Sequence, residues 1–382
     1  MGSFSKKIIR RGSRIRVLVV DDSVVIRRLV THALEADPSL EVVGSAPNGA
    51  IGLARIPQVN PDVITLDIEM PEVDGLEMLR RLRPTYPDLR VIMFSTLTER
   101  GATSTMEALS LGADDYVTKA SNEGSLDRSL ATLRSELIPK IKQFFTLEQD
   151  HVAPPPVATA TASKPRQAIP PNAFRTSIAP EIVAIGVSTG GPTALGAIVP
   201  TIPSDFPLPI LIVQHMPPVF TRLLAERLQT ATKLKVAEAS EGAVVEPGKI
   251  LIAPGNYHMR LAKKGLTTIV TLDQGPQENS CRPAVDVMFR SVEEVYGGSV
   301  IGVVLTGMGY DGLRGAEILK AHGACIIAQD EASSVVWGMP GAVVNAGLAD
   351  SVVPLDGVVP EILRRTGRGM IYSRRAEALS TK

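Results

Sequence analysis

Five side chains in the first third of the chain could together carry out phosphoryl chemistry. Asp21 and Asp22 follow one apolar run, Asp67 ends another, and Ser95 and Lys119 follow the next two. If these runs are parallel strands, their carboxyl ends meet at one edge of a sheet. Clustered carboxylates repel one another unless a cation neutralises them, and their oxygens suit Mg²⁺. We therefore predict a Mg²⁺ site at which Asp67 accepts a phosphoryl group, while Lys119 offsets its charge and Ser95 donates a hydrogen bond.

A simpler interpretation exists for the same residues. Asp21 and Asp22 could cap a helix, and Lys119 could be solvated. The placement of all five polar groups at the ends of strands favours the phosphoryl site over this alternative.

A serine lies at the tip of a glycine-rich turn in the second half of the chain. Residues 186–192 read Gly-Val-Ser-Thr-Gly-Gly-Pro, and they place Ser188 in a Gly-x-Ser-x-Gly pattern after an apolar run. Glycines permit the tight strand-to-helix turn that exposes a nucleophile. The same glycines could instead cradle an anion at a helix N-terminus, or form a plain turn. The spaced Gly-x-Gly-x-x-Gly pattern and the Walker lysine are missing, which favours the nucleophile.

An imidazole and a carboxylate follow two later apolar runs and could activate this serine. His215 comes after residues 210–213, and Asp311 comes after residues 300–305. The order Ser, His, Asp differs from the Ser, Asp, His order of α/β-hydrolases, but a triad is defined by geometry and not by order. His258 stays open as a rival base, in a loop that could line the same cleft. Three other aspartates compete with Asp311: Asp273, Asp286 and Asp330.

The elements that must position these groups form two α/β units. Short β-branched runs alternate with helical patterns through residues 14–135 and again after residue 181, which predicts parallel sheets. Ser23 stands where it would cap the first helix. Residues 148–180 hold seven prolines among Ala, Thr and Ser, and this composition predicts an extended, semi-rigid linker.

Composition excludes several classes of protein. Forty basic residues balance 40 acidic ones among 382, so the chain lacks the positive field of a nucleic-acid-binding protein. Its two cysteines, Cys281 and Cys325, have no spacing typical of metal ligation or of a disulfide framework, which favours a reducing compartment. No signal peptide or run of about 18 apolar residues occurs. We expect a cytoplasmic protein with no direct membrane insertion and no nucleic-acid partner.

Residues 14–135 resemble the receiver family of response regulators. The resemblance rests on the Val-Val-Asp-Asp-Ser string at residues 19–23 and on the residues Asp67, Met70, Pro71, Gly75, Ser95, Tyr116 and Lys119. It implies that Asp67 is the phosphoacceptor. It further implies that Asp22, Asp67 and the Glu69 carbonyl bind Mg²⁺, with Asp21 completing the pocket.

The same resemblance implies a switch at Ser95 and Tyr116, which would reorient on phosphorylation beside Lys119. Thr96, next to Ser95, is an alternative hydroxyl for this role. Ala120 departs from the family, which usually has a proline after the lysine, and the loop geometry at this position is therefore in question.

Residues 181 to about 370 resemble the chemotaxis methylesterase family, CheB. The resemblance rests on the strings at residues 188–192, 214–216, 254–259, 282–286, 307–312, 329–331 and 338–340. It implies that Ser188 is the nucleophile, His215 the general base and acid, and Asp311 the orienting carboxylate. Candidate contacts to the oxyanion or the substrate are Thr189, Met216, Met308 and Arg282.

Together the two resemblances predict four regions. They are a receiver at 14–135, the end of a helix and the linker at 136–180, a doubly wound α/β methylesterase domain at 181–370, and a tail at 371–382. The implied activity is phosphorylation-controlled demethylation of glutamate methyl esters, and deamidation of glutamines, on methyl-accepting chemotaxis receptors. A chemotaxis histidine kinase would be the phosphodonor. We expect Mg²⁺ at the receiver and no cofactor for hydrolysis.

Two rival functions belong to other classes. A DNA-binding response regulator would need a basic recognition helix after the receiver, and a nucleotide-binding module would need saturable nucleotide binding. The neutral charge balance and the large second α/β domain oppose the first, and the combined motifs oppose the second. We also hypothesise that the unphosphorylated receiver covers the Ser188 cleft.

Overall fold

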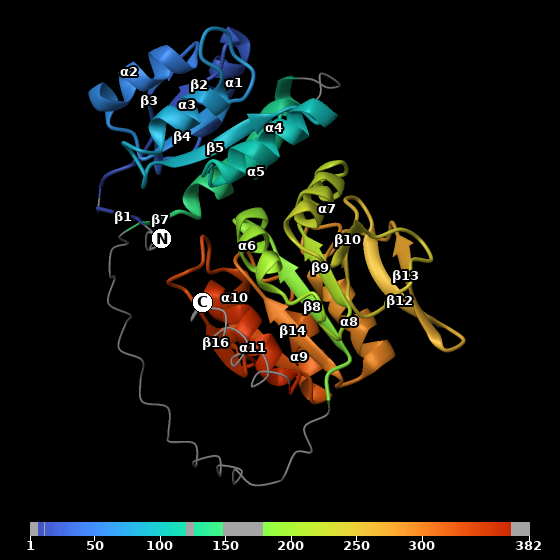
Figure 1. Ribbon diagram of the computed structural model, residues 1–382. Helices are drawn as coiled ribbons and strands as arrows, with labels where there is room; N and C mark the ends of the chain where they lie inside the picture. Colours follow the sequence, from blue (N-terminus) through green and yellow to red (C-terminus); the bar gives the residue numbers. More distant parts are fainter. Residues whose placement is uncertain (1–6, 11, 120–125, 148–178, 368–382) are drawn as a thin grey trace, which may run out of the picture.

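The computed structural model describes residues 7–10, 12–119, 126–147 and 179–367. Figure 1 shows two α/β bodies packed against each other, one coloured blue to cyan and the other green to red. Ala120, the expected tail and nearly all of the expected linker lie outside the described residues. Within those residues no helix is both long and apolar enough to cross a bilayer.

The first body contains the parallel sheet that we predicted, and its strand order is flavodoxin-like. Its strands lie in the order β3-β2-β4-β5-β6, and every neighbouring pair is parallel. All five residues of the central strand β4 are buried, because helices cover both faces of the sheet. The strands are β2 (Ile15–Val20), β3 (Leu40–Ala46), β4 (Val63–Asp67), β5 (Arg90–Ser95) and β6 (Asp115–Thr118).

Side-chain caps begin the first four helices of this body. The Ser23 hydroxyl accepts a hydrogen bond from the Ile26 amide, 3.4 Å away, as the sequence predicted. Asn48, Asp74 and Thr98 cap the next three helices in the same way, satisfying amides that have no partner within a helix. The helices are α1 (Val24–Glu35), α2 (Gly49–Val59), α3 (Gly75–Leu82), α4 (Glu99–Ser110) and α5 (Leu126–Lys142).

A two-stranded parallel ladder joins the beginning and the end of the first body. It pairs β1 (Lys7–Ile9) with β7 (Phe145–Leu147). Lys7 Nζ also lies 2.7 Å from the Asp62 carboxylate at the start of the central strand.

The second body contains a larger parallel sheet, in the order β10-β11-β9-β8-β14-β15-β16. Alternate residues of β8 face two different core clusters, which lie on opposite faces of the sheet. The strands are β8 (Ile182–Val187), β9 (Ile210–Gln214), β10 (Lys235–Glu238), β11 (Lys249–Ile252), β14 (Val300–Val304), β15 (Cys325–Gln329) and β16 (Ser351–Val353).

Helices cover both faces of this second sheet. Residues from α6, α7 and α11 share one core cluster, and residues from α8, α9 and α10 share the other. The helices are α6 (Gly191–Ile198), α7 (Phe220–Ala231), α8 (Val285–Tyr296), α9 (Leu313–Ala321), α10 (Met339–Asn345) and α11 (Val358–Arg365), with 3-10 turns η1 (Val199–Thr201) and η2 (Leu355–Gly357).

An antiparallel hairpin extends from one end of the second body (Figure 1). It pairs β12 (His258–Lys264) with β13 (Thr267–Asp273). His258 is therefore the buried first residue of a strand and not the cleft-lining loop residue that the rival assignment required. Its Nε2 lies 2.9 Å from the Pro276 carbonyl oxygen.

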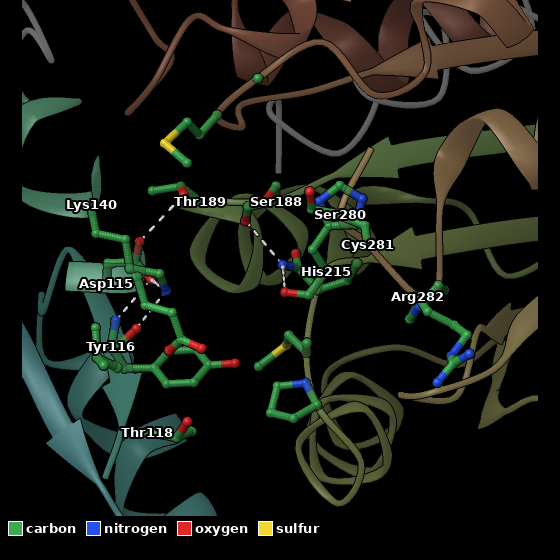
Figure 2. A pocket seen from close by; sticks show the side chains of 18 of the residues that line it. Asp115, Tyr116, Thr118, Lys140, Ser188, Thr189, His215, Ser280, Cys281 and Arg282 are labelled. Carbon is green, nitrogen blue, oxygen red and sulfur yellow. Dashed lines mark hydrogen bonds and ion pairs between the residues drawn. The ribbon is translucent and has the colours of Figure 1, made fainter. Parts of the chain in front are cut away.

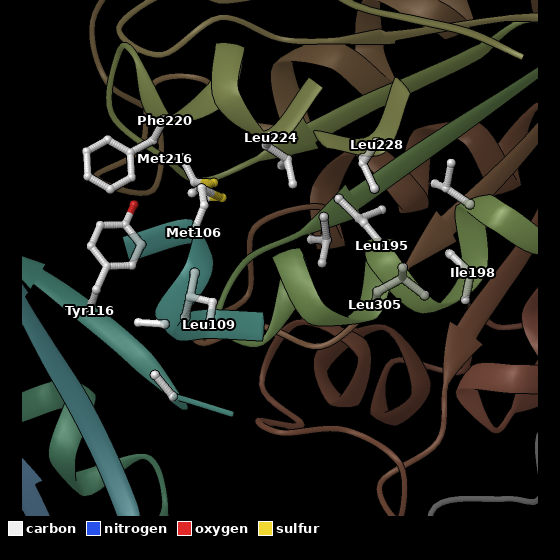
Figure 3. Packing of buried hydrophobic residues seen from close by; sticks show 14 of the residues in the cluster. Met106, Leu109, Tyr116, Leu195, Ile198, Met216, Phe220, Leu224, Leu228 and Leu305 are labelled. Atoms are coloured by element: carbon white, nitrogen blue, oxygen red, sulfur yellow. The ribbon is translucent and has the colours of Figure 1, made fainter. Parts of the chain in front are cut away.

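The two bodies share a continuous apolar core (Figure 3). Met106 and Leu109 of α4 and Tyr116 of β6 belong to the same buried cluster as Phe220 and Leu224 of α7. Polar contacts frame this core: the Arg227 guanidinium donates to the Met106 carbonyl at 2.6 Å, and the Thr193 hydroxyl donates to the Leu109 carbonyl at 3.4 Å.

Candidate active site

The serine turn has the geometry that its glycines predict. β8 ends at Val187, and α6 begins at Gly191, so Ser188 lies between a strand and a helix. Gly190 has a φ of 77°, and a Cβ on it would lie 2.6 Å from a Val335 methyl carbon. The position therefore excludes other residues through both backbone conformation and space.

Gln214 ties the serine turn to the histidine. Its Nε2 donates to the carbonyl oxygen of Ser188 at 3.0 Å and to that of His215 at 3.3 Å. Its Oε1 packs so closely on Gly191 that a Cβ there would lie 1.9 Å from it. Sequence reasoning missed this role, although a glutamine that ends an apolar strand beside a candidate base was a usable signal.

His215 and Asp311 meet beside Ser188, because β8 lies between β9 and β14 in the sheet. His215 Nε2 lies 2.8 Å from Asp311 Oδ2. This edge, where the chain order reverses across the sheet, is where α/β proteins usually place their sites. The structure thus brings the three predicted residues together, and of the four candidate aspartates it places Asp311 against His215.

Asp311 is held by an unusually complete set of donors. Its carboxylate accepts from the amides of Val285 (2.7 Å), Asp286 (3.0 Å) and Gly312 (3.0 Å), and from Asn279 Nδ2 (2.8 Å). Burial by itself would raise the pKa of Asp311, but the hydrogen bond and charge of His215, with the amides, bring it below its usual value. The carboxylate is therefore ionised, and it accepts a hydrogen bond from the N–H group at His215 Nε2.

The carboxylate of Asp286 lies next to that of Asp311. Asn279 Nδ2 also donates to Asp286 Oδ2 at 2.9 Å, so one amide bridges Asp286 and Asp311. Burial raises the pKa of Asp286, and the charge of Asp311 adds to this effect. The two remaining competitors have other partners: Asp273 pairs with Arg260 at 2.6 Å, and Asp330 accepts from the Ser333 amide at 3.0 Å.

The imidazole of His215 faces Cys281 as well as Asp311. Burial disfavours the imidazolium, but the interactions with Cys281 and Asp311 outweigh it and raise the pKa of His215 to about 10. Among the described residues, no hydrogen bond joins the Ser188 hydroxyl to His215. These interactions favour the imidazolium, so His215 must lose a proton before it can accept one from Ser188.

A second cluster lies at the carboxyl edge of the first sheet. Lys119 Nζ lies 2.7 Å from Asp67 Oδ2 and 3.2 Å from Asp21 Oδ2. Oxygens of Asp21, Asp22 and Asp67 all lie within 4.8 Å of one another. Burial raises the pKa of Asp67 to about 6, against the opposing effect of Lys119.

These carboxylates fit a hard divalent cation. Apart from the ion pairs with Lys119, the buried Oδ2 atoms of Asp21 and Asp67 have no hydrogen-bond partner among the described residues. Three clustered carboxylates with unsatisfied oxygens are the donor set that Mg²⁺ prefers. The Glu69 side chain points elsewhere, with an oxygen 3.4 Å from Arg100 Nε, so only its carbonyl is a candidate ligand.

The candidate switch residues Ser95, Thr96 and Tyr116 have partners other than Asp67. The buried Ser95 hydroxyl donates to the Gly101 carbonyl at 3.0 Å and lies 2.6 Å from the Thr105 hydroxyl, which donates to it. Thr96 Oγ1 pairs with Thr98 Oγ1 at 2.8 Å. Tyr116 points into the shared core described above.

Comparison with known proteins agrees with both clusters. The family model for the response regulator receiver domain matches residues 17–131, and that for the CheB methylesterase matches residues 183–362. A protein-glutamate methylesterase/protein-glutamine glutaminase of Trichodesmium erythraeum is 51% identical over 93% of this chain and 99% of its own. The chain belongs to the protein-glutamate methylesterase/protein-glutamine glutaminase family.

Further relatives carry the same description. The Nocardioides protein of that name is 49% identical over 93% of this chain and 96% of its own. The crystal structure of the Thermotoga maritima CheB methylesterase catalytic domain is 43% identical, covers 49% of this chain and 99% of that one, and has a TM-score of 0.48.

The receiver forms one wall of the methylesterase pocket (Figure 2). The cavity, of about 820 Å³, is lined by Ser188, His215 and Cys281 on one side and by Tyr116 and Lys140 on the other. Next to the serine, the Thr189 hydroxyl donates to Asp115 Oδ2 at 3.3 Å, and it lies 3.3 Å from Gln143 Oε1.

The candidate substrate contacts fall in different places. Thr189 and Met216 are buried at the receiver interface, whereas Met308 is exposed at the rim of the pocket. Arg282 points away from Ser188 in Figure 2 and donates to Asn256 Oδ1 at 2.7 Å and to the Gly275 carbonyl at 2.8 Å. These bonds give Arg282 a role in fixing the loop before α8.

Proposed function

We propose that this protein is a phosphorylation-activated hydrolase that demethylates glutamate methyl esters and deamidates glutamines on methyl-accepting chemotaxis receptors. The observation that carries the proposal is the meeting of Ser188, His215 and Asp311 at the ends of three adjacent strands, in a pocket closed on one side by a receiver. The family membership supports the same activity. Its role would be sensory adaptation in the cytoplasm, with a chemotaxis histidine kinase as phosphodonor.

The chemistry would follow from the roles of the three side chains. Ser188 Oγ attacks the ester carbonyl, and its proton passes to the ring nitrogen of His215 that does not face Asp311. The C–O bond breaks as His215 returns this proton to the departing methanol. Water then attacks the acyl-enzyme, His215 again takes and returns a proton, and the receptor glutamate leaves as a carboxylate. With a glutamine substrate, ammonia replaces methanol.

Asp311 would keep His215 in the required orientation and tautomer. Because Asp311 accepts from Nε2, the other ring nitrogen is left to serve as base. The oxyanion would be stabilised by backbone amides near Thr189, Met216 or Met308. The Gly307 amide is already used, since it donates to the Val336 carbonyl at 2.9 Å.

The receiver would control access to this chemistry. Its contacts through Asp115, Tyr116 and α4 support a resting state that keeps a receptor helix away from Ser188. Asp67 would be the phosphoacceptor, and Asp21, Asp22 and Asp67 with the Glu69 carbonyl would hold Mg²⁺, which supplies charge neutralisation for phosphoryl transfer. Ser95, Tyr116 and Lys119 would respond to the phosphoryl group and weaken the interface.

The division of the chain belongs to the same proposal. We place the receiver at 14–135, the methylesterase domain at 181–370, and the helix end with its linker at 136–180. The remaining residues, 371–382, form the tail.

Methanol release from methylated receptor membranes tests this function. Wild type should release methanol, and a small phosphodonor should accelerate it. Ser188→Ala and His215→Ala should lose the activity in both conditions, whereas His258→Ala should retain it if it folds. Loss of activity in His258→Ala with an unchanged circular dichroism spectrum, or full activity in Ser188→Ala, would contradict the assignment.

A further inference from the structure

A thiol and an imidazole that line the catalytic pocket come together with a buried carboxylate behind them, although the three are far apart in the sequence. Ligating atoms of Cys281, His215 and Asp311 all lie within 4.8 Å of one another. Cys281 has no metal-ligand spacing in the sequence, so only the fold assembles this set. Cys281 also lines the cavity, which gives solutes a route to it.

The loop that carries Cys281 is held in a defined conformation. Glu278 and Cys281 exchange backbone hydrogen bonds of 3.1 and 2.9 Å, and between them Asn279 and Ser280 both have positive φ, at 53° and 61°. Non-glycine residues adopt this conformation at a cost, so surrounding contacts must maintain it. Arg290 maintains it through two contacts with the Glu278 carboxylate, one of them 2.8 Å long.

The same loop fixes the carboxylate of the set. Asn279 donates to Asp311 at 2.8 Å, and the Val285 and Asp286 amides donate to it as well. Outer partners of this kind orient metal ligands and are part of a functional metal site. The loop that leads into α8 therefore positions both the Cys281 thiol and the Asp311 carboxylate without a bound cation.

Nitrogen, sulfur and oxygen donors together select a particular class of cation. Zn²⁺ binds Cys, His and Asp in tetrahedral sites, whereas Mg²⁺ requires oxygen ligands. One thiolate and one carboxylate also supply two negative charges, which balance a divalent cation in a largely buried place. The all-oxygen cluster of the receiver has the opposite preference.

We propose that Cys281, His215 and Asp311 form a binding site for Zn²⁺, or for a divalent cation of similar softness, which inhibits the hydrolase reversibly. The proposal of inhibition rests on the function proposed above, whereas the proposal of binding does not. On binding, the thiol and the imidazolium each release a proton to solvent, and bonds form from zinc to sulfur, nitrogen and oxygen. A water completes the tetrahedron, and the imidazole is no longer available as a base.

Metal binding by the full chain tests the site directly. With excess Mg²⁺ present to saturate the receiver, reduced wild-type protein should bind one Zn²⁺ in competition with a chromophoric chelator. Cys281→Ser should bind at least about tenfold more weakly, because it loses a ligand.

With Co²⁺ as probe, wild type should show a thiolate-to-cobalt absorption band that Cys281→Ser lacks. Cys325→Ser is the matched control, since Cys325 lies in β15 and should leave band and affinity unchanged. Equal affinity in Cys281→Ser, or loss of the band in Cys325→Ser, would overturn the site.

Two further measurements use the wild-type protein. The first tests the site even if Cys281→Ser does not fold, and the second separates the metal site from the proposed function. In wild type, Zn²⁺ should slow alkylation of Cys281 but not of Cys325, as mapped by mass spectrometry, and equal alkylation with and without Zn²⁺ would refute the proposal. Zn²⁺ should also stop methanol release by wild type, chelation should restore it, and the residual rate of Cys281→Ser should be insensitive to Zn²⁺. Zinc binding in a protein that releases no methanol under any condition would refute the proposed function and leave the metal site standing.

Discussion

The ring of Tyr116, in the receiver, stacks on the ring of Phe220, in the methylesterase domain, with centroids 4.9 Å apart and planes 7° from parallel. Tyr116 is one of the residues on which the resemblance to receivers rests. Phe220 is the first residue of α7, which directly follows the segment that carries His215. A candidate switch residue of the receiver thus touches the element next to the catalytic base. Under the proposed function, this contact would couple phosphorylation of Asp67 to the active site.

Removing the stack should release the enzyme. We expect Tyr116→Ala to raise methanol release without a phosphodonor about fivefold, because an aromatic pair contributes about 1 kcal/mol and the closed state loses that amount. The ratio of phosphorylated to unphosphorylated rate should fall correspondingly. Arg222→Ala is the control: Arg222 lies 2.7 Å from Glu99 across the same interface, but both side chains are exposed. Such an ion pair contributes little, so this variant should change the basal rate less than about twofold. A basal rate in Tyr116→Ala no higher than that of wild type would argue against release by unstacking.

Replacing the orienting carboxylate should reduce catalysis without unfolding the protein. In Asp311→Asn, an amide group would face donors that now point at a carboxylate, and His215 would lose its anionic partner. We expect kcat to fall by about 10²–10⁴. Asp273→Asn, at the half-exposed last residue of β13, should keep kcat within about twofold. The assignment of Asp311 fails if the two variants have similar kcat values and both retain the native circular dichroism spectrum.

Gln214 should act on kcat more than on KM. Gln214→Met keeps the approximate shape of the side chain but removes the donor to the Ser188 and His215 carbonyls. Displacement of a nucleophile by about 1 Å can cost a factor of about 100 in rate. We also expect a loss of about 1–3 kcal/mol of folding free energy, because buried carbonyls lose their partner. Gln229→Met supplies the comparison, since Gln229 bridges Leu234 and Val236 away from the pocket. It should affect stability alone, and a drop in kcat of equal size in both variants would remove the positioning role.

Asp67 should make the unphosphorylated receiver less stable at neutral pH. Its pKa of about 6 in the fold exceeds the ordinary value of 3.8, so the ionised form is less favourable in the folded than in the unfolded chain. This penalty is absent below about pH 4, grows as the pH rises to about 6, and is constant above that. In Mg²⁺-free buffer, Asp67→Asn should therefore raise the free energy of unfolding by about 1–2 kcal/mol at pH 8 and by much less at pH 4.

Denaturant unfolding at the two pH values measures this difference. The loss of the contact with Lys119 offsets part of this gain in stability. Asp88→Asn, at an exposed position, should change stability by less than about 0.5 kcal/mol at either pH. A lower free energy of unfolding for Asp67→Asn than for wild type at pH 8 would contradict the prediction.

The sequence by itself determined the chemistry and the class of fold. Alternating strand and helix patterns predicted two parallel sheets, and polar residues placed after strands predicted the positions of Ser188, His215, Asp311, Asp67 and Lys119. This works because parallel strands present their carboxyl ends at a single edge, so a residue's place along its own strand already indicates which edge it occupies.

Tertiary structure decided which of the candidates meet. The separation of 96 positions between His215 and Asp311 is bridged only because β8 lies between β9 and β14, and local periodicity does not specify that order of strands. His258 and Asp273 lie in the separate β12-β13 hairpin, whereas Gln214, at the end of β9, lines the pocket with Ser188. Asn279 and Cys281, in the loop before α8, line the same pocket. The packing of Tyr116 on Phe220 depends on how the folded surface of the receiver fits that of the methylesterase domain. No local sequence pattern encodes such a fit.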